Sequence, residues 1–430
     1  MADYDDLITI SQPLNTSRVR IMISGELAEL KRSDDHILHA LLRPRILHVM
    51  KEHPRIEFIQ HDRVLDEACR ELESAHFLGV DTEFVRECTY YPVFCLLQIA
   101  TEDRVICIDP QKLSSVKPLL QVFQSSRALK IFHSARQDLE VLLAALGVLP
   151  EPLHDTQIAA GLVGYPDQIG YSALVYDLFA IRLDKLHTRT DWSRRPLSSE
   201  QLRYAGEDVA YLIATHQKLA GILSDLGRIE WLQEDCANLL KPTLYTNPIE
   251  NAWKRVKGAH EIPATHLNRL HALAAWREET AQELNLPRNW VLRDETLCEL
   301  VRIDSRLDPS TLPRIRGADS SRQRKLGERL IEHIEHVEKL ENSLIDPAYW
   351  TPRFSPETKS LLKECSALVQ RRANELKIAP SLLASRRDLE DLLFRPKASR
   401  INEGWRFQII GRHLLALQEG KRAGLNNDLD

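Results

Sequence analysis

Two acidic residues close a short apolar segment of this chain, and their spacing is typical of a metal site. Residues 77–80 are small or apolar and lead directly into Asp81 and Glu83. If this run is a buried strand, residues two positions apart lie on the same face, so both carboxylates point the same way. They would repel each other unless a cation lay between them. Such pairs also occur by chance on solvated surfaces, so the pair alone leaves both interpretations open.

Three further residues have types that would complete such a site. Asp138 is expected in the first turn of a helix that follows a strand, and Tyr204 and Asp208 are four positions apart on one predicted helix face. In an α/β sheet, strand ends and helix starts line one crevice. Each residue also has an ordinary explanation. Asp138 could simply interact favourably with the helix dipole, as acids in a first turn do. Tyr204 could be a core residue and Asp208 a solvated one.

Together the four carboxylates predict a site for two divalent cations. Without neutralisation their clustering would destabilise the fold. Two cations about 3.5–4 Å apart would neutralise it, and such pairs catalyse in-line attack at phosphorus. A ligand set made only of oxygen atoms favours Mg²⁺ or Mn²⁺ over zinc.

The pattern of apolar residues predicts an α/β domain that positions these side chains and ends near residue 240. Strands are expected at 56–59, 77–84, 93–100, 104–108 and 129–132, with the third and fourth forming a hairpin. Helices are expected near 64–72, 113–124 and 199–225. Capping-box patterns at 134–137 and 198–201 predict two helix starts, the first for the helix that carries Asp138.

The rest of the chain is predicted to be helical and divided into two modules. A linker is expected at 241–248, and a second proline-rich break spans 346–356. Residues 283–300 align without gaps on residues 375–392 in their apolar pattern, which indicates a repeated helical unit. Residues 1–55 contain no motif, and we hypothesise that translation starts at Met50.

Composition narrows the class of protein. Of the 430 residues, 43% are hydrophobic and 28% charged, which is typical of globular proteins of about two to four domains. No apolar run approaches the ~20 residues of a membrane span, and the N-terminus lacks a secretory pattern. The seven cysteines form no Cys-x-x-Cys pair, which argues against a disulfide framework or zinc knuckle and predicts a reducing, cytoplasmic location.

Several segments resemble a known family of nucleases. Residues 80–84, 130–140 and 204–209 resemble the three exonuclease motifs of the DEDDy 3′–5′ exonucleases. Residues 84–92 and 188–197 resemble segments of the ribonuclease D family in particular. The two helical modules resemble the helicase-and-RNase-D C-terminal (HRDC) domain, the second less closely than the first. Cys88 and Gly206 depart from the family pattern, but neither replaces a ligand.

The resemblance implies a ribonuclease H-like α/β exonuclease domain, with a mixed sheet flanked by helices, followed by two small all-α HRDC-like domains. The implied divisions are an extension at 1–55, the DEDDy exonuclease domain at 56–240, and HRDC domains at 241–340 and 350–430. Asp81, Glu83, Asp138 and Asp208 would bind two Mg²⁺ or Mn²⁺ ions, and Tyr204 would orient the attacking water. RNA would be hydrolysed from its 3′ end to 5′-mononucleotides, with tRNA precursors and other structured RNAs as substrates and no nucleotide cofactor.

Two other functions stay open on the sequence. A 3′–5′ DNA exonuclease of the Werner or proofreading kind would use the same metal chemistry, and contacts to a 2′-hydroxyl cannot be read from a sequence. A non-catalytic RNA-binding scaffold is expected to lack at least one ligand, whereas all four acids and the tyrosine are present. The chain has no phosphate-binding P-loop, which argues against a helicase.

Eight further residues are candidates for RNA contact, each with a structural alternative: His133, Arg189, Trp192, Arg194, Arg195, Lys254, Arg255 and Lys257. His133 is equally consistent with a structural histidine. The loop at 189–195 offers phosphate contact and base stacking, or else an interdomain brace. Residues 254–257 open the first helical module, where a solvated helix face is the alternative. Asp155 is predicted to be a helix N-cap, and His333 and His336 exposed helix residues rather than zinc ligands.

Overall fold

The computed structural model describes residues 10–11, 18–23, 26–31, 55–183, 190–303, 320–339, 345, 355–395 and 399–427. Near the N-terminus, β1 (Ile10–Ser11), β2 (Arg18–Ile23) and β3 (Glu26–Lys31) form a small antiparallel sheet. Met50 lies outside the described residues, so the translation start stays a prediction. Among the described helices, none has the length and apolar character needed to cross a bilayer.

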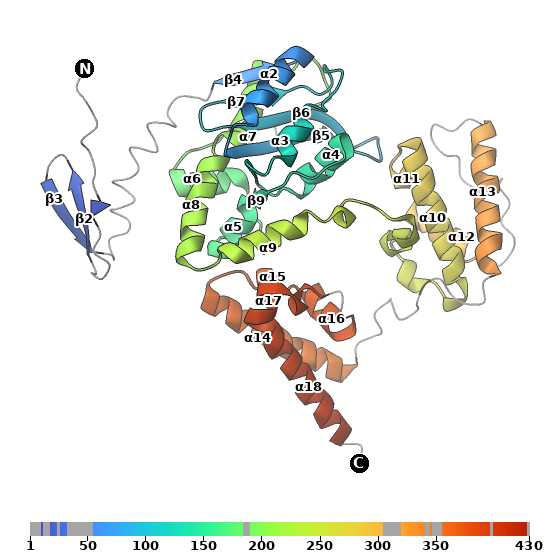
Figure 1. Ribbon diagram of the computed structural model, residues 1–430. Helices are drawn as coiled ribbons and strands as arrows, with labels where there is room; N and C mark the ends of the chain where they lie inside the picture. The colour runs from blue at the N-terminus through green and yellow to red at the C-terminus, as the bar shows by residue number, and fades with distance from the viewer. Residues whose placement is uncertain are drawn as a thin grey trace.

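The α/β domain is built on one mixed sheet of six strands (Figure 1). In spatial order the strands are β4 (Ile56–Ile59), β7 (Val105–Ile108), β6 (Val93–Ala100), β5 (Phe77–Val85), β8 (Leu129–Phe132) and β9 (Leu153–Asp155). The β5–β6 and β6–β7 pairs are antiparallel, and the other neighbouring pairs are parallel. The five predicted strands and the hairpin are therefore confirmed, whereas β9 was missed because its three residues hold a single apolar side chain.

Helices cover both faces of this sheet, and the alternation of β5 decides which of its residues meets which layer. Leu78 and Val80 pack into a core shared with α2 (Asp62–Leu72), α3 (Leu119–Gln124) and α4 (Arg136–Leu146). The opposite face is covered by α7 (Ser199–Ala210) and the start of α8 (Leu212–Asp225). Residues of β5 that alternate with Leu78 and Val80 therefore point toward α7.

One of the two predicted capping boxes does not form. The helix α4 begins at Arg136, and Ser134 instead has a left-handed backbone with φ 62°. The backbone N–H groups of Ser134 and Ala135 donate to the Asp155 carboxylate, at 3.0 and 2.8 Å. The Asp155 carboxylate thus accepts from the Ser134 N–H that a capping box would assign to the Gln137 side chain. At Ser198 the predicted capping box is present in full.

Two predicted helices have different lengths in the structure. The helix expected at 113–124 is confined to α3, which begins at Leu119. The helix expected at 199–225 is broken at Tyr211 into α7 and α8, because the Tyr211 N–H donates to the Tyr171 hydroxyl at 3.1 Å instead of continuing the helical ladder. The α/β domain is completed by α5 (Thr156–Val163), α6 (Tyr171–Phe179) and α9 (Ile229–Leu239).

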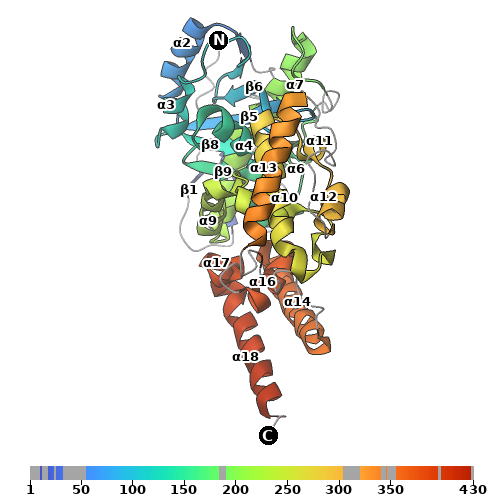
Figure 2. The ribbon, with the colours of Figure 1, turned by 90° about the vertical axis from the view of Figure 1, so that its right-hand side faces the viewer.

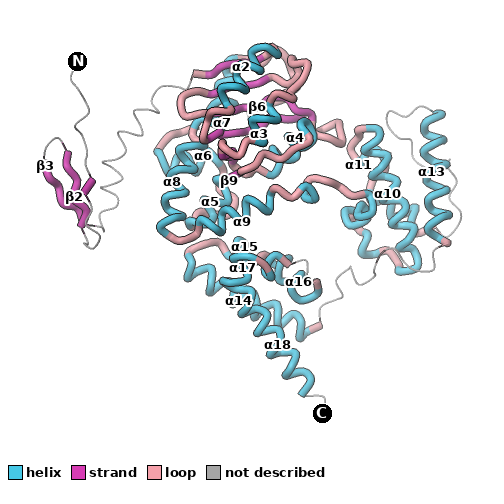
Figure 3. Tube along the Cα trace, viewed as in Figure 1, coloured by secondary structure: helices cyan, strands magenta, loops and turns pink. Residues whose placement is uncertain are grey.

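Beyond α9, the described residues form helices and no strand, as predicted. The first module contains the 3₁₀ helix Ile249–Arg255, then α10 (Leu267–Leu284), α11 (Arg288–Val291), α12 (Asp294–Val301) and α13 (Ser320–Glu338). The second contains α14 (Pro356–Leu376), α15 (Pro380–Leu383), α16 (Arg386–Phe394), α17 (Gly404–Arg406) and α18 (Arg412–Asn427). Figure 3 shows these helical parts beside the strand-containing domain.

The aligned segments of the two modules have the same succession of elements. In both, a long helix ends at a left-handed residue, Asn285 with φ 49° in the first and Lys377 with φ 55° in the second. A one-turn helix (α11 or α15) and then a longer helix (α12 or α16) follow at the same spacing. The gapless alignment of 283–300 on 375–392 therefore corresponds to a repeated backbone arrangement.

The second module packs directly on the α/β domain. The Trp231 and Trp405 rings are stacked at 4.4 Å between centroids, with planes 6° apart. Beside them the Arg406 guanidinium pairs with the Asp235 carboxylate, with an Nη2–Oδ2 distance of 2.9 Å. The apolar side chains of this module belong to the same buried cluster as β5 and α4. In Figure 2 its helix α17 lies just below α9, and α14 and α18 extend downward from there.

Candidate active site

The acids of β5 are held on the face that α7 covers. Asp81 and Glu83 are half-buried and pair in register with Gln98 and Leu96 of β6. The register shifts between Glu83 and Phe84, so the regular pairing of β5 with β6 is interrupted directly after the second acid. The strand therefore fixes the backbone of both acids while leaving their side chains accessible.

Tyr204 and Asp208 reach the same place from α7. The capping box at Ser198 fixes the start of this helix, and a spacing of four puts both residues on one face. The Tyr204 hydroxyl is hydrogen-bonded to the Asp208 carboxylate. The tyrosine ring is buried against Trp192, with ring centroids 6.3 Å apart. Packing thus determines where the hydroxyl points.

Asp138 approaches from the other side of the sheet, at the start of α4. Its Oδ1 accepts hydrogen bonds from the Thr82 hydroxyl at 2.6 Å and from the Thr82 N–H at 3.2 Å. Thr82 lies between Asp81 and Glu83 on β5, so the strand itself connects the third acid to the first two. Asp138 is buried, with 6% of its surface exposed.

Burial and mutual repulsion shift the carboxylates toward their protonated forms. Burial, followed by repulsion from Asp138, Asp208 and Glu83, raises the pKa of Asp81 well above its usual range. Burial and the charges of Asp208 and Asp138 raise the pKa of Glu83 to about 9. Burial raises the pKa of Asp138 and of Asp208 to about 7 each. Four acids are therefore held together at a cost that a bound cation would remove.

The site has the composition and spacing that divalent cations require. One ligand oxygen from each of Asp81, Glu83 and Asp208 lies within 4.8 Å of the others, and this is the single such group of three or more among the described residues. The Asp138 carboxylate lies outside that group but raises the pKa of Asp81 and Glu83 by its charge. Oxygen ligands alone suit Mg²⁺ or Mn²⁺. The residues present therefore fit a magnesium- or manganese-type centre.

A glycine permits the close approach of α7 and α8 to β5. The Cβ of an alanine at Gly79 would lie 3.0 Å from the Leu212 Cβ and 3.1 Å from the Val209 carbonyl oxygen, neither of which is the end of a flexible side chain. We expect Gly79→Ala to lower the free energy of unfolding by about 1–3 kcal/mol and to reduce activity, because overpacking displaces the helix that carries Asp208. Urea denaturation and the rate of RNA hydrolysis measure the two effects.

The matched control for this substitution is Gly221→Ala on α8. A Cβ at Gly221 would meet no atom within 4 Å. We expect this variant to be as stable as the unmodified protein or more stable by up to about 1 kcal/mol, since alanine favours a helix over glycine. Equal denaturation midpoints for the two alanine variants would contradict the role given to Gly79.

His133 and Asp155 both have structural roles. The His133 ring nitrogens lie 2.9 Å from the Thr156 hydroxyl and 2.9 Å from the Ile169 carbonyl, so both are already engaged. Asp155 is the N-cap of α5, as predicted, and accepts from Gln157 N–H at 2.8 Å. It therefore organises the starts of both α4 and α5.

Most of the basic loop before α7 packs against the sheet and α7. Arg195 forms a paired interaction with Asp109, at 2.6 and 2.8 Å, and donates to the Trp192 and Cys95 carbonyls. Trp192 is 4% exposed, so it supports Tyr204 and has no free face for stacking a base. Arg194 is exposed and pairs with Asp191. Arg189 lies outside the described residues.

The candidates of the helical module divide into two groups. Lys254 is exposed and lies over the Trp253 ring at 5.5 Å. Arg255 and Lys257 line a cavity between the module and the α/β domain. His333 and His336 lie on α13, and no metal-ligand group of three forms around them in the described part of the chain.

Sequence reasoning missed two residues that hold the site. Thr82 lies between the acids of the first motif, and a threonine in a strand gives no signal that its hydroxyl will hold Asp138. Tyr171 is half-buried beside the site, and after burial itself the charges of Asp208 and Asp81 raise its pKa. Its hydroxyl also accepts the N–H at the break between α7 and α8. Nothing in the local sequence around Tyr171 indicates this contact.

Comparison with known families identifies two regions of the chain. Residues 56–224 match the family described as 3′-5′ exonuclease, and residues 266–334 match the HRDC domain. The chain is 38% identical over 382 residues to ribonuclease D of Zymomonas mobilis, which covers 87% of this chain and 96% of the relative. It is 35% identical over 376 residues to ribonuclease D of Acidiphilium cryptum, covering 86% of this chain and 95% of the relative.

A solved structure has the same architecture. The Escherichia coli RNase D crystal structure, described as that of an exoribonuclease involved in structured RNA processing, matches with a TM-score of 0.75 and 29% identity over 85% of this chain and 99% of its own. A protein from Bifidobacterium adolescentis shares the fold, with a TM-score of 0.61 and 22% identity. The sheet is thus of the ribonuclease H-like exonuclease type, followed by a helical HRDC domain. The chain belongs to the ribonuclease D family of 3′–5′ exoribonucleases.

Proposed function

We propose that this exoribonuclease releases 5′-mononucleotides with the help of two divalent cations, Mg²⁺ or Mn²⁺, held by Asp81, Glu83, Asp138 and Asp208. The observation that carries the proposal is the group of three carboxylates from β5 and α7 whose oxygens lie within 4.8 Å of one another. Burial raises the pKa of all three, and the charges of neighbouring acids add to it for Asp81 and Glu83; divalent cations would relieve both costs.

The bound cations would lower the pKa of the attacking water and stabilise the departing 3′-oxygen. The protein's part is to hold the ligands and the water in place. Thr82 orients Asp138 through two hydrogen bonds, and the β5 backbone orients its two neighbours. Burial raises the pKa of the Tyr204 hydroxyl, so it keeps its proton and orients water by hydrogen bonding rather than acting as a base.

The domain divisions at 56–240, 241–340 and 350–430 are part of this proposal, with 1–55 as an extension. We assign the last division as a second HRDC-like domain. The support is the matched succession of α10 to α12 and α14 to α16, each with a left-handed residue after the long helix. The first division boundary falls just after α9, which ends at Leu239.

Structured RNAs with a free 3′ end, tRNA precursors among them, are the substrates we propose. The support is the Escherichia coli relative, which is described as an exoribonuclease involved in structured RNA processing. All seven cysteines are free thiols, which supports a reducing, cytoplasmic location.

The test of this function uses RNA and DNA strands of one sequence, labelled at either end, with Mg²⁺. We expect label at the 3′ end to be released at once as a mononucleotide, and 5′-labelled RNA to shorten stepwise. The DNA strand should be degraded at least about 10-fold more slowly, the cost of about one lost hydrogen bond to a 2′-hydroxyl. Faster digestion of the DNA would assign the chain to the DNA exonucleases instead, and no digestion of either strand would leave the scaffold function.

A further inference from the structure

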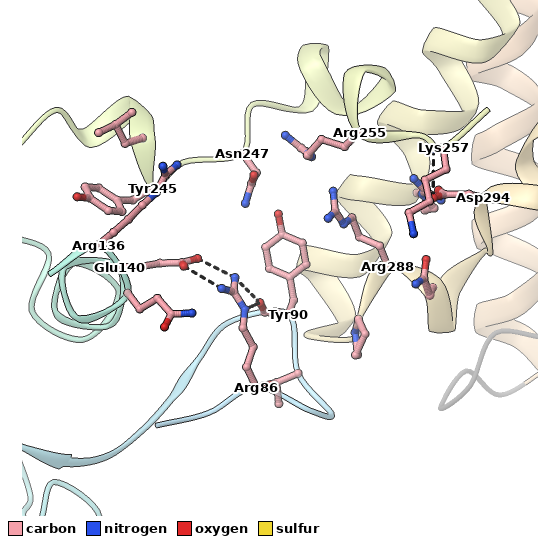
Figure 4. Close-up of a pocket in the computed structure, with 16 residues that line it drawn as sticks. Arg86, Tyr90, Arg136, Glu140, Tyr245, Asn247, Arg255, Lys257, Arg288 and Asp294 are labelled. Atoms are coloured by element: carbon pink, nitrogen blue, oxygen red, sulfur yellow. Dashed lines mark hydrogen bonds and ion pairs between the residues drawn. The ribbon is translucent and has the colours of Figure 1, made fainter. Parts of the chain in front are cut away.

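A cavity of about 680 Å³ lies between the exonuclease domain and the first helical module. It is lined by the loop after β5, by the outer face of α4, by the linker after α9 and by the start of the helical module. Figure 4 shows Arg86, Arg136 and Tyr245 on one side and Arg255, Arg288 and Lys257 on the other, with the Tyr90 ring between them. Both domains therefore contribute walls.

The cavity has an excess of positive charge. Six of its lining residues are arginine or lysine, namely Arg86, Arg136, Arg255, Lys257, Arg277 and Arg288. Three carboxylates oppose them. Glu140 pairs with Arg86, Asp294 pairs with Arg277, and the buried Glu278 is shared by Arg255 and Arg288. No acidic side chain among the described residues pairs with Arg136 or Lys257.

Some of these guanidinium groups have donors left over. Arg277 is 2% exposed, and its Nη1 donates to the Leu292 carbonyl at 3.1 Å and to Asp294 at 2.6 Å. Its Nε has no hydrogen-bond partner in the described part of the chain, and the same holds for the Nε of Arg255. The Arg288 Nη1 makes no hydrogen bond but lies 3.6 Å from Glu278 Oε2, so it is already neutralised. These donors are buried below the cavity surface, so the charge that a ligand meets comes from the lining cations without an acidic partner, Arg136 and Lys257. The cavity therefore favours a ligand that brings several anionic oxygens.

The position of the cavity relative to the catalytic acids indicates which ligand would supply these anionic oxygens. Arg136 and Glu140 are four positions apart on the accessible face of α4, whereas Asp138 between them is buried against Thr82. Arg86 follows β5 directly. None of the four acids lines the cavity, and a helix with its side chains is about 10–12 Å across, so the cavity lies beside the proposed metal site and not at it.

We propose that this cavity binds backbone phosphates of the RNA strand a few nucleotides upstream of its 3′ end, while that end lies at the acids. The proposal rests on the proposed function and adds the place where the strand is held. Cations on two walls, with the Tyr90 and Tyr245 side chains and the Asn247 amide among them, match a single-stranded polyanion better than one small anion.

The experiment compares a double variant, Arg136→Gln with Lys257→Gln, to a control of equal charge change. The control carries Arg127→Gln and Lys325→Gln, both exposed residues that do not line the cavity. Steady-state kinetics use a dinucleotide and a long single-stranded RNA. We expect the double variant to raise KM for the long RNA by about 10-fold, with kcat and the dinucleotide KM unchanged, since the lost contacts lie upstream of the reacting phosphate.

Equilibrium binding separates this proposal from the proposed function. Labelled long RNA is titrated into chains that also carry Asp81→Asn, so no hydrolysis is needed. The double variant should bind about 10-fold more weakly, and each lost phosphate contact should lower the slope of log Kd against log salt by about 0.7. Equal affinities of double variant and control would overturn the proposal, as would an equal KM change for the dinucleotide. A third outcome would also overturn it. If adenosine monophosphate competed with the dinucleotide in the unmodified protein but not in the double variant, the cavity would bind a free nucleotide instead of the RNA backbone.

Discussion

Asp81→Asn is expected to reduce the rate of RNA hydrolysis by about 1,000-fold or more, because a lost metal ligand removes several kcal/mol of transition-state stabilisation. Asp81 supplies one of the three ligand oxygens that lie within 4.8 Å of one another, and after burial the charges of all three other acids raise its pKa. Initial rates with labelled RNA, at saturating Mg²⁺ and with chelator, measure the effect. Chelator should bring the unmodified protein down to the level of the variant.

The same substitution should raise stability when no metal is present. With chelator, the raised pKa of Asp81 means that folding must either protonate this carboxylate or hold its charge among the other acids. Asparagine avoids that cost, so we expect a higher Tm than that of the unmodified protein. With Mg²⁺ the order should reverse, because the variant gains less from binding. Glu102→Gln, at an exposed turn, is the control and should change neither quantity. Hydrolysis by Asp81→Asn at the unmodified rate would refute the assignment of the metal site.

Tyr204→Phe is expected to lower kcat by about 100-fold, with KM within about 2-fold, because the hydroxyl orients the water and the ring is kept. Burial and the nearby acids raise the pKa of Tyr204, so the hydroxyl stays protonated below that pKa, throughout the range of an activity assay. The loss in kcat should therefore be constant between about pH 6 and pH 9. Full kinetics of both proteins across that range measure it.

A different pH profile would assign a different role to the tyrosine. If Tyr204 acted as a base through its deprotonated form, the loss would grow as pH rises and shrink as pH falls. Tyr176→Phe provides the control, since Tyr176 is an exposed tyrosine of the same domain that lies beneath Arg182. It should leave kcat and KM unchanged.

Local patterns in the sequence were sufficient for the elements that carry the acids. The apolar run before Asp81, the hairpin of β6 and β7, and the capping box at Ser198 each depend on residues close together in the chain. Five of the six strands of the sheet and the positions of the acids on strand and helix could therefore be predicted. The roles of those acids as metal ligands stay a prediction until activity is measured.

Local sequence patterns gave the wrong role for residues whose contacts are with partners distant in the chain. Ser134 fits a capping box, but the Asp155 carboxylate, about twenty positions later in the chain, is a charged acceptor for the N–H groups of Ser134 and Ala135. Trp192 and Arg195 have the composition of an RNA-contacting loop. Their burial depends on Asp109 and Tyr204, which no local pattern connects to them.

The stacked indoles of Trp231 and Trp405 have a consequence for how the molecule unfolds. Because the C-terminal helices share one apolar cluster with the catalytic sheet, these two parts form one cooperative unit, whereas the first helical module has a separate cluster that includes Tyr90. A protein truncated before residue 355 would expose the Trp231 ring and the apolar surface around it. Loss of activity in such a truncation would then report aggregation or partial melting rather than loss of an RNA-binding surface.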